Sequence, residues 1–203
     1  MMCQAKRAGY ERLHTALDLH DRKCDLNLAR LHKAGIQGVR TVSGDACELD
    51  EVLTSFDAML GEPVMFDTVF IDAPCSGTGT MRRHPEIPWR LTERDVTVDL
   101  PKLQLTMLKE AAARVTAGGE LIYATCSVFD EENMQVVDAF LNSPEGAGFS
   151  VAPLSEAQIL QLPEFEQAKK LVSVRQNDRG LFQSVPVNAD SYDGHFCARL
   201  VHK

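Results

Sequence analysis

The stretch Phe66-Asp-Thr-Val-Phe-Ile-Asp-Ala-Pro-Cys-Ser-Gly-Thr-Gly79 decides the fold of this chain. It begins with an apolar run from Phe66 to Ile71, broken only by Asp67 and Thr68. Such a run is typical of a strand that is buried on both faces of a parallel sheet. An acid, a proline, a cysteine and small residues follow at once, so we expect a tight loop at the carboxyl end of this strand.

Hydrophobic periodicity on both sides of this stretch predicts strands and helices in alternation. Before it, we expect strands over residues 14–19 and 39–43 and helices over 21–33 and 49–60. After it, we expect a helix over 103–115 that ends at Gly118-Gly119, a buried strand over 121–124, a helix over 130–141, and late strands over 149–154 and 195–201. This order predicts an α/β fold with a mostly parallel, doubly wound sheet, to which the late strands can add an antiparallel pair.

Length and composition limit the classes of protein. The 203 residues fit one domain, with residues 1–145 as an α/β core and 146–203 as its C-terminal strands and loops. A net charge of −8 restricts any contact with nucleic acid to a local patch. The longest apolar run, Leu121 to Ala124, is too short for a membrane span. The six cysteines form no C-x-x-C pair, which predicts reduced thiols in a cytoplasmic protein, and His20 with Cys24 is too little for a metal site.

Polar side chains follow four of the expected strands. Asp18 ends the first strand, Asp45 follows the second, Asp72 and Cys75 follow the third, and Cys126 follows the fourth. Open α/β sheets bind ligands at the carboxyl ends of their strands, so these residues are the candidate site. Turn formation or helix capping explains any one of them equally well.

Four motifs carry a resemblance to a known family. In chain order they are Asp72-Ala-Pro-Cys-Ser-Gly-Thr-Gly79, Arg82-Arg-His-Pro-Glu-Ile87, Tyr123-Ala-Thr-Cys-Ser127 with Glu131-Glu-Asn133 behind it, and Asp193-Gly-His-Phe-Cys-Ala-Arg-Leu200. The sequence is similar to the Sun family of RNA cytosine-5 methyltransferases, in its bacterial small-subunit ribosomal RNA branch. The resemblance implies a Rossmann-like methyltransferase fold that uses S-adenosylmethionine, with ribosomal RNA as its partner and no membrane.

The resemblance also implies roles for the catalytic residues. It makes Cys126 the nucleophile, Cys75 the second cysteine that helps to release methylated RNA, and Asp72 the acid at the ring nitrogen of cytosine. The chemistry needs such a thiolate, because carbon 5 of cytosine is too electron-poor to attack a methyl sulfonium until a nucleophile adds to carbon 6. We expect a cationic neighbourhood or a nearby helix start to depress the pKa of Cys126.

Binding residues follow in the same way. The resemblance assigns Asp18 to the ribose hydroxyls and Asp45 to the adenine amino group, and it counts Asp72 with the cofactor-binding acids. A basic cluster with one aromatic side chain is expected to contact RNA. This cluster consists of Arg82, Arg83, His84, Trp89, Arg90 and Arg94, with Lys169, Lys170, Arg175 and Arg179 as an extension. A solvated arginine-rich loop is the other interpretation of the cluster.

One family element is missing before the matching stretch. The family has a strand and a glycine-rich loop there, and residues 1–12 contain only Gly9 and no such loop. We therefore expect an N-terminally truncated fold whose sheet opens in the middle, with weakened cofactor binding. Two functions stay open: an RNA cytosine-5 methyltransferase catalytic domain, and an inactive RNA-binding or assembly module of the same fold.

Overall fold

The computed structural model describes residues 14–154, 176–186 and 192–203. The chain divides into two compact units, Met1–Val64 and Met65–Lys203, which are described separately below. One domain over the whole chain therefore stays a prediction. No helix in the described ranges is long and apolar enough to cross a membrane.

The first unit is a small α/β layer. Its elements in chain order are β1 (His14–Asp18), α2 (Asp21–Lys33), β2 (Val39–Ser43), the 3₁₀ turn η1 (Ala46–Glu48) and α3 (Leu49–Leu60). β1 and β2 pair in parallel, with Asp18 opposite Ser43, and α2 connects them. The buried Cys24 of α2 lies with its Sγ 3.3 Å from the carbonyl oxygen of Val42, which fastens the helix to β2.

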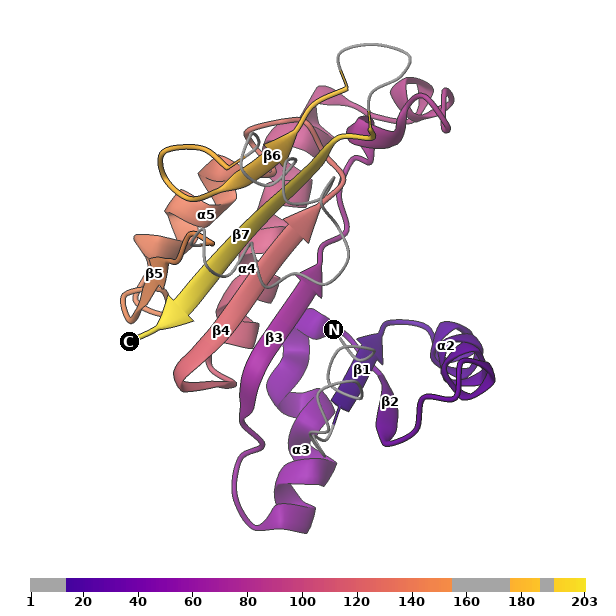
Figure 1. Ribbon diagram of the computed structural model, residues 1–203, viewed down its shortest axis with the longest axis vertical. Coiled ribbons are helices and arrows are strands. Elements are labelled where there is room, and N and C mark those ends of the chain that lie inside the picture. Colours follow the sequence, from indigo (N-terminus) through magenta and orange to yellow (C-terminus); the bar gives the residue numbers. More distant parts are fainter. Residues whose placement is uncertain (1–13, 155–175, 187–191) are drawn as a thin grey trace. The chain divides into compact units, whose positions relative to one another are not determined.

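The second unit contains the larger sheet. Its strands and helices are β3 (Phe66–Asp72), α4 (Leu100–Ala112), β4 (Val115–Thr125), α5 (Met134–Leu141), β5 (Phe149–Val151), β6 (Phe182–Ser184) and β7 (His195–His202). The strand order is β3-β4-β7-β5, and β6 also pairs with β7 (Figure 1). β3 and β4 are parallel, whereas β7 is antiparallel to β4, β5 and β6. The predicted antiparallel pairing of the two late strands is confirmed, and the described strands form two sheets, one in each unit.

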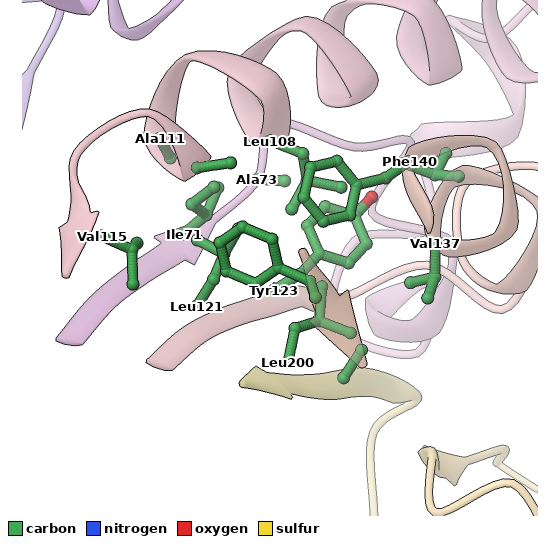
Figure 2. Packing of buried hydrophobic residues seen from close by; sticks show 14 of the residues in the cluster. Ile71, Ala73, Leu108, Ala111, Val115, Leu121, Tyr123, Val137, Phe140 and Leu200 are labelled. Carbon is green, nitrogen blue, oxygen red and sulfur yellow. The ribbon is translucent and has the colours of Figure 1, made fainter. Parts of the chain in front are cut away.

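Apolar side chains from α4, α5 and the sheet form the core of the second unit. Figure 2 shows Leu108 and Ala111 of α4 and Phe140 of α5 packed over Leu121 and Tyr123 of β4. Leu108, Leu121, Tyr123 and Phe140 are fully buried, as is Leu200 of β7. The core therefore fixes β3, β4 and β7 against the helices, and with them the loops that follow β3 and β4.

The second unit corrects two details of the sequence analysis. The expected burial of β3 on both faces is wrong, since Phe70 is 56% exposed, because α4 and α5 pack on one face of the sheet. The helix expected over 103–115 ends at Ala112, and β4 begins at Val115 and runs through Gly118-Gly119. Pairing of Val115 with Phe66 draws this segment into the sheet, and the register shifts before Glu120 pairs with Thr68.

Candidate active site

Two loops meet at the carboxyl ends of β3 and β4. The register places Asp72 opposite Ala124, and the amide of Ala73 donates to the carbonyl oxygen of Ala124 over 2.9 Å. The loops that follow carry Cys75 and Cys126, whose sulfur atoms lie 3.3 Å apart. Parallel pairing of the two strands thus brings together two cysteines that are 51 positions apart in the sequence. We call Cys75 and Cys126 the thiol pair.

A third loop, just before β7, closes against the other two. The amide of Gly79 donates to the carbonyl oxygen of Cys126 over 2.8 Å, and the amide of Gly194 donates to the carbonyl oxygen of Gly79 over 2.9 Å. A Cβ on Gly79 would lie 2.1 Å from the oxygen of Gly194, so no side chain fits there. The absence of a side chain at Gly79 thus allows close approach of the Gly194 backbone.

Electrostatics distinguishes the two thiols. The hydrogen bond from Cys75 lowers the pKa of Cys126 to about 6, with a smaller lowering by His195, against the raising effects of burial and of Asp72. The pKa of Cys75 is raised strongly, first by its bond to Cys126, then by burial and by the charge on Cys126. The pKa shifts of the two thiols are thus opposite, lowered for Cys126 and raised for Cys75, which favours Cys126 as the thiolate and Cys75 as the donor. The expected low pKa of Cys126 is present, but its main cause is the partner thiol rather than a cation or a helix start.

Asp72 is an exposed carboxylate at the end of β3. It acts on the thiol pair through its charge, which raises the pKa of Cys126. Asp72, Cys75 and Cys126 thus belong to one cluster, as the strand ends predicted.

A buried polar network lies beneath the thiol pair, and the sequence analysis missed it. Ser76, Ser127 and Glu132 are buried and hydrogen-bonded to one another. Glu132 belongs to the Glu131-Glu-Asn133 segment of a family motif, to which the sequence analysis assigned no role, and the helix expected from residue 130 begins only at Met134. The serines directly after both cysteines were the available signal.

The basic cluster lies in the loop that follows β3. Arg82 and Arg83 pair with Asp193 of the loop before β7, at 3.6 and 2.5 Å, and both arginines are about half exposed. The Asp193 carboxylate is only 13% exposed, whereas the two guanidinium groups keep exposed surface that an RNA phosphate can reach. Trp89 is 89% exposed, and Arg90 is exposed as well.

The other described basic residues of the prediction, apart from Arg90, each have an acidic partner. His84 lies 3.3 Å from Glu86, and Arg94 bonds to Asp99 over 3.1 Å. Arg179 pairs with Asp138 of α5, which ties it to that helix. The other predicted members of the extension, Lys169, Lys170 and Arg175, lie outside the described residues.

The two acids predicted to bind the cofactor lie in the first unit, at the carboxyl ends of β1 and β2. Asp18 accepts a hydrogen bond from the amide of His20 over 3.0 Å, and Asp45 accepts one from the amide of Cys47 over 2.8 Å. Each bond uses Oδ1 and holds the carboxylate in place. The two acids also cap local turns, so both interpretations of these residues are compatible with the geometry.

The family follows from comparison of the whole chain with known proteins. A family model described as 16S rRNA methyltransferase RsmB/F matches residues 9–201. The chain belongs to this family. Relatives named ribosomal RNA small subunit methyltransferase B include one from Escherichia coli O6:K15:H31, 36% identical over 138 residues, and one from Salmonella arizonae, 47% identical over 85 residues. These alignments cover 68% and 42% of this chain, but only 27% and 20% of the relatives.

Solved structures share the fold of this chain. PH0851 aligns with a TM-score of 0.70 and 29% identity, over 92% of this chain and 36% of that one. NSun6 from Pyrococcus horikoshii with SFG aligns with a TM-score of 0.70 at 20% identity, over 98% of this chain and 44% of that one. The fold is thus the Rossmann-like fold of S-adenosylmethionine-dependent methyltransferases, as the sequence predicted.

Proposed function

We propose that this chain carries the catalytic site of an RNA cytosine-5 methyltransferase that modifies 16S ribosomal RNA through a covalent adduct on Cys126. One observation carries the proposal: the sulfur atoms of Cys75 and Cys126 lie 3.3 Å apart at the carboxyl ends of two parallel strands, where the pKa of Cys126 is lowered to about 6. A reactive thiolate is what addition to carbon 6 of cytosine requires. Membership of the RsmB/F family supports ribosomal RNA as the substrate class.

The thiol pair supports an order of events. The Cys126 sulfur forms a bond to carbon 6 of cytosine, and the electron density released into the ring makes carbon 5 nucleophilic. Asp72, as an exposed acid beside the pair, can hold the ring nitrogen 3 side and share a proton. After methyl transfer the proton on carbon 5 must leave, so that the bond between carbon 6 and sulfur can break and Cys126 departs as a thiolate.

Adduct formation changes Cys75. Two of the three causes that raise its pKa are the hydrogen bond to Cys126 and the negative charge on Cys126, and both disappear once that sulfur is bonded to carbon. The pKa of Cys75 then falls, although burial still opposes ionisation. Cys75 is therefore held as an acid before attack and becomes a competent base afterwards, when the carbon 5 proton has to be removed.

The acids of the first unit suit the cofactor. S-adenosylmethionine, when bound, supplies the electrophilic methyl group. Asp18 and Asp45 each offer carboxylate oxygens to hydroxyl and amino donors. Each accepts a backbone amide on Oδ1, and Lys23 Nζ lies 3.8 Å from Oδ1 of Asp18. These carboxylate acceptors suit the hydroxyl groups of a ribose and the amino group of an adenine, which are donors. Asp72 stays a proposed member of both the catalytic and the cofactor set.

Covalent trapping tests the proposal. With S-adenosylmethionine and small-subunit ribosomal RNA that contains 5-fluorocytosine, we expect an adduct that survives denaturing electrophoresis, because fluorine on carbon 5 cannot leave as a proton does. Cys126→Ala should abolish this adduct, whereas Cys75→Ala should accumulate one even with unmodified RNA. The opposite behaviour of the two variants would reverse their roles. RNA binding without any adduct in the unchanged protein would instead favour the inactive RNA-binding module.

A further inference from the structure

Glu132 occupies an unusual position for a carboxylate. It is fully buried, although α5 begins only two residues later and the neighbouring Glu131 is partly exposed. Burying a carboxylate is costly unless donors replace the lost water. Three donors do so here: the Ser76 amide at 2.8 Å, the Ser127 hydroxyl at 2.7 Å and the Gln104 amide nitrogen at 3.1 Å.

These donors come from three different parts of the second unit. Ser76 follows Cys75, Ser127 follows Cys126, and Gln104 lies on α4. Gln104 also donates to the carbonyl oxygen of Pro74 over 3.0 Å, on the other side of Cys75. Glu132 therefore binds the residue that follows each cysteine, and through Gln104 it reaches the residue that precedes Cys75.

The same carboxylate also receives indirect support. The Ser76 hydroxyl donates to the Ser127 hydroxyl over 3.1 Å, and the latter donates to Glu132, so the two cysteine loops are linked twice. The Tyr123 hydroxyl donates to the backbone oxygen of Glu132 over 2.6 Å, which anchors the residue to the core strand β4. The separation of the two sulfur atoms depends on both loops, and Glu132 is the charged group that holds them together.

We propose that Glu132 is a positioning residue, which sets the distance between Cys75 and Cys126 so that Cys75 can donate its hydrogen bond to the Cys126 thiolate. This proposal rests on the proposed function only because it takes the Cys126 thiolate as the nucleophile. A positioning role and a direct charge effect of Glu132 predict opposite shifts of the Cys126 pKa. Loss of the negative charge alone would lower the pKa of Cys126, whereas loss of the hydrogen bond from Cys75 raises it.

The test is the pH dependence of Cys126 alkylation in the 203-residue chain, with iodoacetamide as the probe and peptide mass spectrometry to identify the modified thiol. In the unchanged chain we expect a midpoint near the pKa of about 6, which Cys75 and His195 lower and Asp72 raises. Glu132→Gln keeps the shape but loses the charge, and it should raise the midpoint by about one pH unit or more, toward the ordinary thiol value. Glu131→Gln, the same change one residue earlier, should leave the midpoint in place.

A double variant separates positioning from general damage. In a Cys75→Ala background there is no partner thiol left to position, so Glu132→Gln should no longer raise the midpoint, and loss of the negative charge alone should lower it. If Glu132→Gln fails to fold, Gln104→Met removes one donor from α4 without altering either loop, and it should raise the midpoint as well. An unchanged or lowered midpoint in the folded Glu132→Gln or Gln104→Met chain overturns the proposal. Because alkylation needs neither RNA nor cofactor, a raised midpoint in a chain that forms no RNA adduct would retain Glu132 as a positioning residue and reject the methyltransferase function.

Discussion

Replacing Cys75 with alanine tests the origin of the Cys126 thiolate. The hydrogen bond at 3.3 Å is the largest cause of the low pKa of Cys126, which is about 6 against an ordinary 9.0. Without it, burial and Asp72 oppose ionisation and only weaker effects such as that of His195 favour it. We therefore expect the pKa of Cys126 to rise by about two to three units in Cys75→Ala.

The magnitude decides which assay to use. At pH 7 a pKa of about 6 leaves roughly 90% of Cys126 as thiolate, whereas a value near 9 leaves roughly 1%. A more basic thiolate is intrinsically more nucleophilic, by roughly 20-fold for three units, so the alkylation rate at one pH falls only a few-fold. The midpoint of a full pH series from 4 to 10 is therefore the informative measurement. A midpoint that stays near 6 in a folded Cys75→Ala chain would refute the assignment of Cys75 as the donor.

Three further predictions concern other parts of the second unit. Neutralising Arg82 and Arg83 together should weaken binding of ribosomal RNA and reduce the slope of log affinity against log salt by about one per lost phosphate contact, whereas an unchanged slope would make the loop a solvated surface. Hydrogen peroxide should oxidise the thiol pair to a disulfide, and the two thiol hydrogens leave as water. Mass spectrometry of peptides should detect this disulfide in the unchanged chain and not in Cys75→Ser. Leu108→Ala should cost about 2–5 kcal/mol of unfolding free energy in urea titrations, since Leu108 is fully buried in the core, and a cost below 1 kcal/mol would contradict the packing.

Several elements of the fold were predictable from local pattern alone. The helix over Asp21–Lys33, the strand over Val39–Ser43 and the helix over Leu49–Leu60 have the bounds that periodicity predicts, because polar or glycine residues stop each of them. The conformation of the segment after α4 was not predictable in this way, because Gly118-Gly119 looks like the end of a helix. Pairing with β3 decides its conformation there, and a single sequence does not contain that partner's register.

The candidate site likewise has features that the sequence predicted and features that it did not. Cys75 and Cys126 were predictable, because cysteines after two parallel strands must lie at one edge of the sheet. The hydrogen bond between them, which is the main cause of the low pKa of Cys126, required the distance between the sulfur atoms. Glu132 was hidden, because an acid near the start of an expected helix has an ordinary explanation in the helix dipole. Only the burial of its carboxylate shows otherwise.

The position of β7 in the sheet has a consequence for how the protein is made. β7 comes after every other described strand in the sequence, yet it lies inside the sheet, with β4 on one side and β5 and β6 on the other. The turn before it supplies Gly194 to Gly79 and Asp193 to the arginines. Translation therefore releases both cysteines of the thiol pair from the ribosome well before the strand that completes their surroundings. Until residues through His202 emerge, β4 has an unpaired edge and the nascent chain exposes unassembled thiols, so ribosome-bound chains stopped before β7 should be the species most open to oxidation and aggregation.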